Sequence, residues 1–214
     1  MGRKRNEEYI EAAQTAAQEI LIAEGYNAAS YTAIAEHTGI ARTTVQHYFP
    51  AKESFATELM TRIADVAAKR AADMTPEDES NFVTYYLTSQ LAYGVFYLTE
   101  GTRQFLYDIC ASRELQHAAA PDYMKSAFEM FSIKSATDKD MFDLQYAMGG
   151  IYEIHYLYIR EGKTPDFAQL LSRIIKTLAR MTGISNEECN RILEQYTIDH
   201  EELFAIGREL YAQL

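Results

Sequence analysis

Apolar residues recur three and four positions apart along almost the entire 214-residue chain, with polar and charged residues between them. This spacing places the apolar side chains on one face of an α-helix, so the sequence predicts an all-α protein. A first one-sided helix is expected at about 6–24 and another at about 51–73, after which a proline and three acidic residues at 76–79 break the pattern. No strand pattern and no internal repeat competes with these helices.

Residues 80–100 are apolar or aromatic on nearly every side, as expected of a helix in the centre of a domain, and Gly101 is predicted to end that helix. Further helices are expected at about 102–119, 121–135, 138–161 and 167–182, followed by two helices after residue 186 that are separated near 197–200.

Residues 30–49, SYTAIAEHTGIARTTVQHYF, contain two short amphipathic segments on either side of a glycine. Ser30 can cap the first segment, Ala35 allows close approach of two backbones, and Gly39 tolerates a left-handed turn. These features predict two helices that meet at a steep angle, as in a helix-turn-helix. An ordinary helical hairpin in an all-α core uses the same small residues, so the pattern by itself leaves both interpretations open.

The second segment has an apolar side and a polar side. Ile40, Val45 and Phe49 supply the apolar side of a helix expected from about Arg42 to Tyr48. The opposite side carries short or planar hydrogen-bonding side chains, which are the kind that reach base edges in the major groove of DNA. These candidate base-reading residues are Arg42, Thr43, Thr44, Gln46 and His47.

The flanks of this segment carry a more specific signal. An amphipathic helix that ends in Glu24-Gly25-Tyr26 precedes it, and Phe49-Pro50-Ala51-Lys52-Glu53 leads into the next amphipathic helix. With these flanks, residues 6–66 resemble the DNA-binding domain of the TetR family of transcriptional regulators. The resemblance implies a three-helix DNA-binding domain at 1–50 and a larger helical ligand-binding and dimerisation domain at 51–214. It also implies that Tyr48 and Lys52 contact phosphates.

Three positions depart from the family pattern. Ala41 and Ala51 stand where the family usually has capping residues, and losing such a cap costs about 1 kcal/mol of helix stability. Gln46 replaces an aromatic residue that commonly lies against the DNA backbone. A glutamine bonds either a phosphate or an adenine, so both roles remain open for it.

The charge distribution reconciles a net charge of −11 with DNA binding. Residues 1–52 hold five Lys and Arg and six Asp and Glu, whereas 53–214 hold fifteen and twenty-five, so the acidic excess is C-terminal. Arg3, Lys4 and Arg5 form a candidate basic arm in front of the first helix. A solvated terminus without a role in binding is an equal alternative for this arm.

The chain has sixteen tyrosines and no tryptophan, and many of the tyrosines lie between residues 85 and 158, which makes the middle of the chain a candidate ligand site. A buried phenol needs a hydrogen-bond partner, which either another side chain or a ligand supplies, and ordinary packing is the alternative for each single tyrosine. Because the resemblance implies a C-terminal ligand cavity, we expect a flat, largely apolar or aromatic effector there. The candidate lining residues are Tyr86, Tyr93, Tyr97, Arg103, Tyr107, Phe128, Tyr152 and His155.

Two adjacent glycines, Gly149 and Gly150, lie inside a predicted helix, where they cost roughly 1–2 kcal/mol relative to alanines. Close helix approach compensates for such a cost. It can occur within one subunit or, as the resemblance implies, between the late helices of two subunits. The candidate dimer contacts are Gly149, Gly150, Leu157, Leu171, Ile174 and Leu178.

The leading hypothesis is a homodimeric regulator, most simply a repressor, that binds a palindromic double-stranded operator and is released by a small molecule. An enzyme is the first rival, but none of GxSxG, GxGxxG, GxxxxGK[ST] or HExxH occurs. A helical interaction module of the same fold that no longer binds DNA is the second. We expect no cofactor and no metal, because Cys110 and Cys189 are isolated. Without a signal peptide or an 18-residue apolar run, we expect a cytoplasmic location away from the membrane.

Overall fold

The computed structural model describes residues 2–118 and 137–214, and all of the regular structure in these two ranges is helical. The prediction of an all-α fold is confirmed. The predicted helix at 121–135 lies outside the described residues. The helices are α1 (Gly2–Glu24), α2 (Tyr31–Thr38), α3 (Arg42–Tyr48), α4 (Glu53–Met74), α5 (Asn81–Phe96), α6 (Glu100–Ala111), α8 (Asp138–Arg160), α9 (Phe167–Thr182), α10 (Asn186–Gln195) and α11 (His200–Tyr211).

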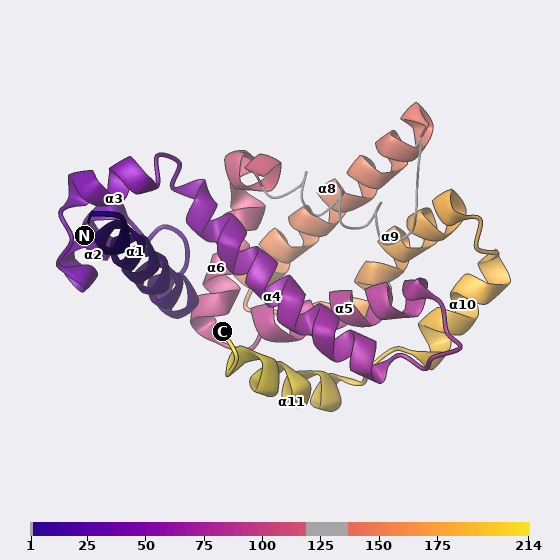
Figure 1. Ribbon diagram of the computed structural model, residues 1–214. Helices are drawn as coiled ribbons and strands as arrows, with labels where there is room; N and C mark the ends of the chain where they lie inside the picture. The colour runs from indigo at the N-terminus through magenta and orange to yellow at the C-terminus, as the bar shows by residue number, and fades with distance from the viewer. Residues whose placement is uncertain (1, 119–136) are drawn as a thin grey trace.

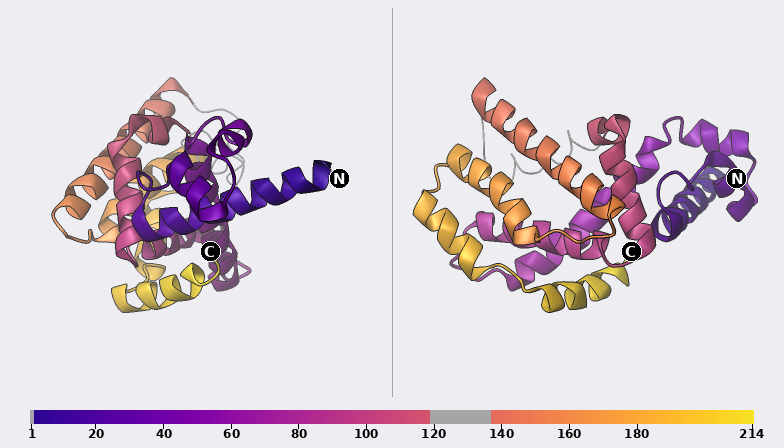
Figure 2. Two further views of the ribbon diagram at one scale, coloured as in Figure 1. Left: turned by 90° about the vertical axis from the view of Figure 1, so that its left-hand side faces the viewer. Right: turned by 180° about the vertical axis from the view of Figure 1, so that it is seen from behind.

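The helices divide the molecule into two ends that α4 joins. Helices α1, α2 and α3 gather at one end, and α4 leads from them along the remaining helices (Figure 1). The view from behind in Figure 2 shows the same separation, with α8, α9 and α10 at the far end. Helix α5 packs against α4, α9 and α11, and it is buried along most of its length, as its apolar sequence predicts. The α2–α3 pair packs against α1, and α1 in turn packs against α4 and α6. Helix α1 therefore connects the pair to the rest of the protein.

Local capping signals explain where several helices begin and end. The side chains of Thr137, Asp166 and Ser185 accept backbone N–H groups at the starts of α8, α9 and α10. Gly183 ends α9 in the left-handed conformation with φ of 75°. These boundaries agree with the expected helices to within a few residues.

Gly101 corrects one prediction, because it does not end the helix before it. Helix α5 stops at Phe96, and Gly101 lies in the first turn of α6. A Cβ atom at Gly101 would lie 2.1 Å from the carbonyl oxygen of Ile22 in α1, so only glycine lets α6 approach α1 this closely. Helix α6 also ends at Ala111, and residues 113–118 form a separate helical segment where one helix to about residue 119 was expected.

Helices α5 and α11 make a second contact without intervening side chains. A Cβ atom at Gly94 would lie 3.0 Å from the Leu203 carbonyl oxygen, and one at Gly207 would lie 2.9 Å from the Gly94 carbonyl oxygen. The two backbones therefore touch where these glycines face each other. Both glycines are buried, and the contact anchors the C-terminal helix on the central one.

A bidentate ion pair connects α10 to the loop between α4 and α5. The two terminal nitrogen atoms of Arg191 donate to the two carboxylate oxygens of Glu79, each over 2.9 Å, and Tyr196 donates to the same carboxylate over 2.8 Å. These hydrogen bonds from Arg191 and Tyr196 lower the pKa of Glu79. The paired, bidentate geometry is the strong form of this interaction.

Three residues that were expected at a subunit contact lie in the core of their own chain. Leu171, Ile174 and Leu178 are at most 3% exposed, because α9 packs this apolar side against α5 and α8. These three side chains therefore have almost no exposed surface with which to contact a second subunit. In the described part of the chain, no helix is long and apolar enough to cross a membrane, and no group of three His, Cys, Asp or Glu residues is placed to hold a metal ion.

Candidate nucleic-acid interface

The α2–α3 pair has the geometry of a helix-turn-helix. The Ser30 hydroxyl accepts the Ala33 N–H over 3.1 Å at the start of α2, and Gly39 closes α2 in the left-handed conformation with φ of 69°. Ile34 and Val45 are at most 1% exposed and lock the two helices onto the core. Ala35 is half-buried. Sequence and structure agree on the bounds of α3, which are Arg42 and Tyr48.

One side of α3 faces solvent at the edge of the molecule (Figure 1). Arg42, Thr43, Gln46 and His47 are exposed on it, and Thr44 is half-buried between them. All five candidate base-reading residues are thus brought together on one short helix. A face of this composition can offer donors and acceptors to base edges.

The starts of α3 and α4 lack side-chain caps, as Ala41 and Ala51 in the sequence predict. Ala41 precedes α3 without a side-chain cap, and the helix begins with the Thr44 and Val45 N–H groups bonded to the Ala41 carbonyl oxygen. No side chain caps α4 either, where Lys52 occupies the capping position. Packing has to fix the start of α3, because no local side chain does.

A contact that sequence reasoning missed fixes the other end of α3. The Tyr31 hydroxyl at the start of α2 donates to the Phe49 carbonyl oxygen over 2.7 Å, and the Phe49 ring lies 4.5 Å from the Phe55 ring of α4. These contacts hold the C-terminal end of α3 between α2 and α4. No sequence signal distinguishes Tyr31 from the other tyrosines.

The two expected phosphate-contacting residues lie in different environments. Tyr48 is half-buried on α3, with its ring 5.4 Å from the ring of His47. The Lys52 ammonium donates to the Tyr26 carbonyl oxygen over 2.7 Å and lies 3.9 Å from the centre of the Tyr26 ring. Burial lowers the pKa of Lys52, and the nearby carboxylates of Asp108 and Glu53 partly offset this effect.

The three residues of the candidate basic arm belong to α1. The helix begins at Gly2, so Arg3, Lys4 and Arg5 continue it and do not form an extended segment in front of it. Their side chains are outside the part of the chain whose contacts the structure describes.

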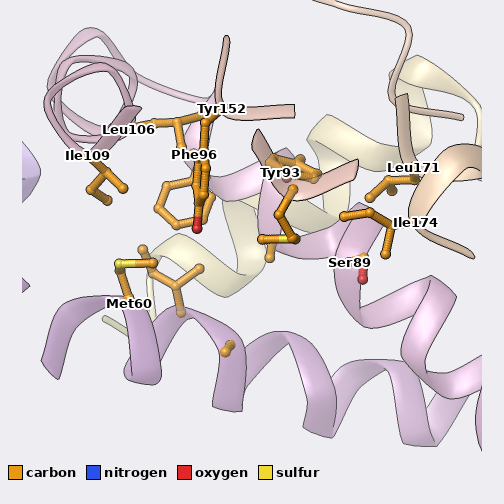
Figure 3. A pocket seen from close by; sticks show the side chains of 13 residues that line it. Met60, Ser89, Tyr93, Phe96, Leu106, Ile109, Tyr152, Leu171 and Ile174 are labelled. Carbon is orange, nitrogen blue, oxygen red and sulfur yellow. The ribbon is translucent and has the colours of Figure 1, made fainter. Parts of the chain in front are cut away.

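A small apolar cavity of about 130 Å³ lies between α4, α5, α6, α8 and α9. Figure 3 shows Tyr93, Phe96 and Tyr152 on its walls, with Met60 on one side and Leu171 and Ile174 on the other. Among the described residues, its polar groups come from Ser89, Tyr93 and Tyr152, and none of the lining residues is charged. Burial raises the pKa of Tyr152 to about 12, so this phenol is neutral and can donate a hydrogen bond.

Two of the eight candidate pocket residues, Tyr93 and Tyr152, line this cavity. His155 packs against Tyr93, whose ring is 4.5 Å from the imidazole, and Tyr97 contacts His155 in turn. Arg103 donates to the Tyr97 carbonyl oxygen over 3.2 Å and does not line the cavity.

The remaining candidates lie elsewhere. The Tyr86 hydroxyl bonds the Thr197 hydroxyl over 2.7 Å, so this phenol is satisfied within the protein. Tyr107 stacks on Tyr156 with the ring centres 5.1 Å apart and lines a separate polar hollow. Phe128 lies outside the described residues. Tyrosine content alone could not separate these roles, because it does not show which phenols find partners in the chain.

His155 is a buried histidine with one satisfied nitrogen. Its Nδ1 atom lies 2.7 Å from the Tyr97 hydroxyl, and its Nε2 atom has no hydrogen-bond partner among the described residues. Burial lowers the pKa of this imidazole to about 3, so it is neutral at physiological pH.

The outer side of α8 exposes large apolar side chains. Phe142 is 66% exposed and Tyr146 is 78% exposed, and their rings stack 6.4 Å apart. Gly149 and Gly150 are exposed on the same helix, and a Cβ atom at either would meet no atom of the described residues within 4 Å. Together with Arg173 and Arg180 of α9, the residues around Tyr146 and these glycines border a hollow of about 700 Å³. Of the other expected contacts, Leu157 is half-buried.

Comparison with known families identifies the N-terminal end of the chain. Residues 15–59 match the family described as bacterial regulatory proteins, tetR family, and the match covers the C-terminal part of α1, all of α2 and α3, and the start of α4. No curated protein and no solved structure matches the chain.

Proposed function

We propose that the chain is a DNA-binding transcriptional regulator of the tetR family, which acts as a homodimeric repressor and leaves a palindromic operator when a small molecule binds. In this proposal residues 1–50 bind DNA and residues 51–214 regulate and dimerise. The protein works in the cytoplasm, where the DNA is.

The observation that carries the proposal is the exposed polar side of α3 on a rigidly held α2–α3 pair. Arg42, Thr43, Thr44, Gln46 and His47 are the side chains we assign to base edges, and they project from a helix that Ile34 and Val45 anchor. Tyr48 and Lys52 are assigned to phosphates. For Lys52 this role requires the ammonium to exchange the Tyr26 carbonyl oxygen for a phosphate oxygen, or to bond both.

The exposed side of α8 supports dimerisation. Phe142 and Tyr146 present apolar rings to solvent, which is unfavourable for a monomer, and Gly149 and Gly150 leave room for a second backbone. We therefore place the two-fold contact on α8 around residues 142–150, together with the exposed side of α9. A symmetric dimer would present two α3 helices about one DNA turn or somewhat more apart.

The cavity supports a small, uncharged effector. A volume of about 130 Å³ is close to that of engineered apolar cavities of about 150 Å³ that bind benzene, and below the roughly 300 Å³ of a typical drug-sized site. Its walls are apolar apart from a serine and two tyrosines. We infer a ligand that is the size of one aromatic ring and carries a hydrogen-bond acceptor for a phenol. Larger ligands require the walls to move.

Selection of bound duplexes from a randomised DNA library tests DNA recognition even though the operator sequence is unknown. We expect recovered sequences with inverted symmetry and half-sites about one helical turn apart. Arg42→Ala in the same selection should lose that sequence preference. Recovery of no preferred sequence by a folded dimer would instead favour a helical module of the same fold that no longer binds DNA, for which Ala41, Gln46 and the net charge of −11 are the supporting features.

Thermal-shift screening against single-ring compounds, followed by measurement of operator affinity, tests the effector. Compounds that raise the melting temperature should weaken operator binding, and by linkage the operator should weaken the compound by the same factor. Tight binding in the cavity that leaves operator affinity unchanged would show that this cavity is not the switch.

A further inference from the structure

One buried carboxylate connects the regulatory end of the molecule to the turn before the α2–α3 pair. Asp108 lies on α6 and is 4% exposed. Its Oδ2 atom accepts the Tyr26 N–H over 2.8 Å and the Asn27 N–H over 3.2 Å. Its Oδ1 atom accepts the Asn27 side-chain amide over 2.9 Å and the Gln104 side-chain amide over 2.9 Å. Two of these donors are backbone groups of the α1–α2 turn.

The packing around Asp108 leaves the turn little freedom to move independently of α6. Gly25 starts the turn with φ of 87°, and a Cβ atom there would lie 2.7 Å from the Gln104 side chain and 2.9 Å from Asp108. On the same side of α6, Gly101 touches the backbone of α1 at Ile22. The turn and the adjoining end of α1 therefore rest directly on α6.

The same turn is also bonded to the start of α4. Lys52 donates to the Tyr26 carbonyl oxygen over 2.7 Å, and the Tyr26 hydroxyl donates to Glu53 over 3.2 Å. Any shift of the turn thus changes where the Lys52 ammonium lies. Since Lys52 is one of the assigned phosphate contacts, this shift would also alter the DNA-binding surface.

The other side of α6 faces the cavity. Leu106 and Ile109 line it, and Ile109 directly follows Asp108 in sequence. A helix of 12 residues that packs on the cavity with one side and on the turn with the other transfers a displacement between them as a rigid body. A ligand that fills the cavity would contact Leu106 and Ile109, and a resulting displacement of α6 would act on Tyr26 and Asn27 through their hydrogen bonds to Asp108.

We propose that Asp108 is the positioning residue that transmits occupancy of the cavity to the α2–α3 pair, because its carboxylate holds the α1–α2 turn on α6. The consequence for DNA rests on the proposed function. The transmission itself is a property of the protein without DNA, so it can be tested separately.

The test uses a substitution as the probe of occupancy, because Ala92→Leu adds three carbon atoms to the cavity wall. Six full-length proteins are compared: the unaltered chain, Asp108→Asn and Glu100→Gln, each with and without Ala92→Leu. Asp108→Asn keeps the shape of the side chain but replaces one accepting oxygen with a donor, which then faces other donors. Glu100→Gln is the matched control, because Glu100 is an exposed carboxylate on the same helix.

Amide hydrogen exchange at Tyr26 and Asn27, followed by NMR, is the first measurement. We expect Ala92→Leu to change the exchange rate of these amides at least fivefold in the unaltered chain and in Glu100→Gln, and less than twofold in Asp108→Asn. If Asp108 has only a structural role, Ala92→Leu should change the exchange rates of these amides equally in all three backgrounds. Equal responses, or no response in the unaltered chain, would overturn the proposal.

Asn27→Ala provides a second variant in case Asp108→Asn does not fold. Asn27 is exposed, so its loss should be tolerated, and it removes the 2.9 Å bond to Asp108 from the other side. The response of the Tyr26 amide to Ala92→Leu should then be reduced. An undiminished response would count against the proposal.

Operator affinity of the same proteins, on the selected duplex, is the second measurement. Ala92→Leu should lower it about tenfold in the unaltered chain and less than twofold with Asp108→Asn, while affinity for random DNA changes little in either background. If the amides respond but operator affinity does not, the transmission through Asp108 stands and ligand-induced release from DNA fails.

Discussion

The Lys52 ammonium lies 2.7 Å from the Tyr26 carbonyl oxygen and 3.9 Å from the centre of the same residue's ring. One residue of the α1–α2 turn thus supplies both an acceptor and an aromatic face to a cation at the start of α4. Burial lowers the pKa of Lys52, and the nearby carboxylates of Asp108 and Glu53 partly offset this effect. These two contacts hold the positive charge of Lys52 in one position near the surface of the N-terminal domain.

Lys52→Ala should weaken binding to every DNA sequence by a similar factor, because a phosphate contact carries no base information. The salt dependence of binding should also become shallower, with the slope of log affinity against log salt falling by about 0.9 for each phosphate that is no longer neutralised. Titrations at several salt concentrations measure both effects. Lys69→Ala, an exposed lysine farther along α4, should leave the slope unchanged. A changed sequence preference with unchanged overall affinity would show that Lys52 reads bases.

Thr44→Val should lower affinity for the selected operator more than affinity for random DNA. The substitution keeps the branched shape and removes the hydroxyl group, so any bond to a base edge disappears, at about 1–3 kcal/mol of discrimination for a good contact. Competition binding with both duplexes measures the ratio. Thr57→Val, whose hydroxyl donates to the Glu53 carbonyl oxygen within α4, is the control. An equal loss on both duplexes would assign Thr44 to the backbone.

Gly150→Leu should abolish dimerisation without unfolding the protomer. A Cβ atom at Gly150 would meet no atom within 4 Å in the part of the chain that the structure describes. Leucine is favoured over glycine in a helix by about 1 kcal/mol, so the isolated subunit should be at least as stable. Sedimentation velocity and circular dichroism measure the two quantities. Gly150→Ala gains the same helix propensity with a small side chain and should remain dimeric. A dimeric Gly150→Leu protein would place the subunit contact elsewhere.

His155 should remain neutral down to about pH 3 in the folded protein, while in the unfolded chain it takes up a proton near pH 6.5. Its folded pKa is depressed, so its contribution to stability is complete above pH 6.5 and decreases as the pH falls towards 3. Between pH 7 and pH 5 this linkage lowers the free energy of unfolding by about 2 kcal/mol. Urea unfolding at both pH values measures it, and His155→Gln should show a smaller decrease. An NMR signal assigned to the His155 imidazole that titrates above pH 5 would contradict this expectation.

Features of the fold that depend on residues close together in the chain could be predicted from the sequence. Ser30 and Gly39 define α2 through groups within a few residues of each other, and the polar side of α3 follows from its own spacing. Gly101 was assigned wrongly because its role depends on Ile22, a residue of α1 that is near it only in the folded chain. The same limit applies to Asp108, whose hydrogen bonds to Tyr26 and Asn27 form only when α6 packs against the α1–α2 turn.

The apolar side of α9 shows a second limit. An apolar stripe predicts that Leu171, Ile174 and Leu178 are covered, but it does not say whether the same chain or another covers them. The tyrosines behave similarly, since Tyr86 finds a partner in Thr197 and Tyr152 faces a cavity. Which element covers a side chain is decided by packing between distant segments, so the candidate cavity and dimer surface could be assigned only in part.

The backbone contact between Gly94 of α5 and Gly207 of α11 also restricts how this sequence can vary through evolution. Each glycine faces main-chain atoms, which cannot rotate away as a side chain can, so even alanine at either position forces the two helices apart. We therefore expect relatives that share this arrangement of α5 and α11 to retain glycine at both positions, including where the surface of α8 and the cavity have diverged. A relative that has lost one of the two glycines should have a displaced or missing C-terminal helix, so the glycine pair can serve to recognise proteins that share this contact between α5 and α11.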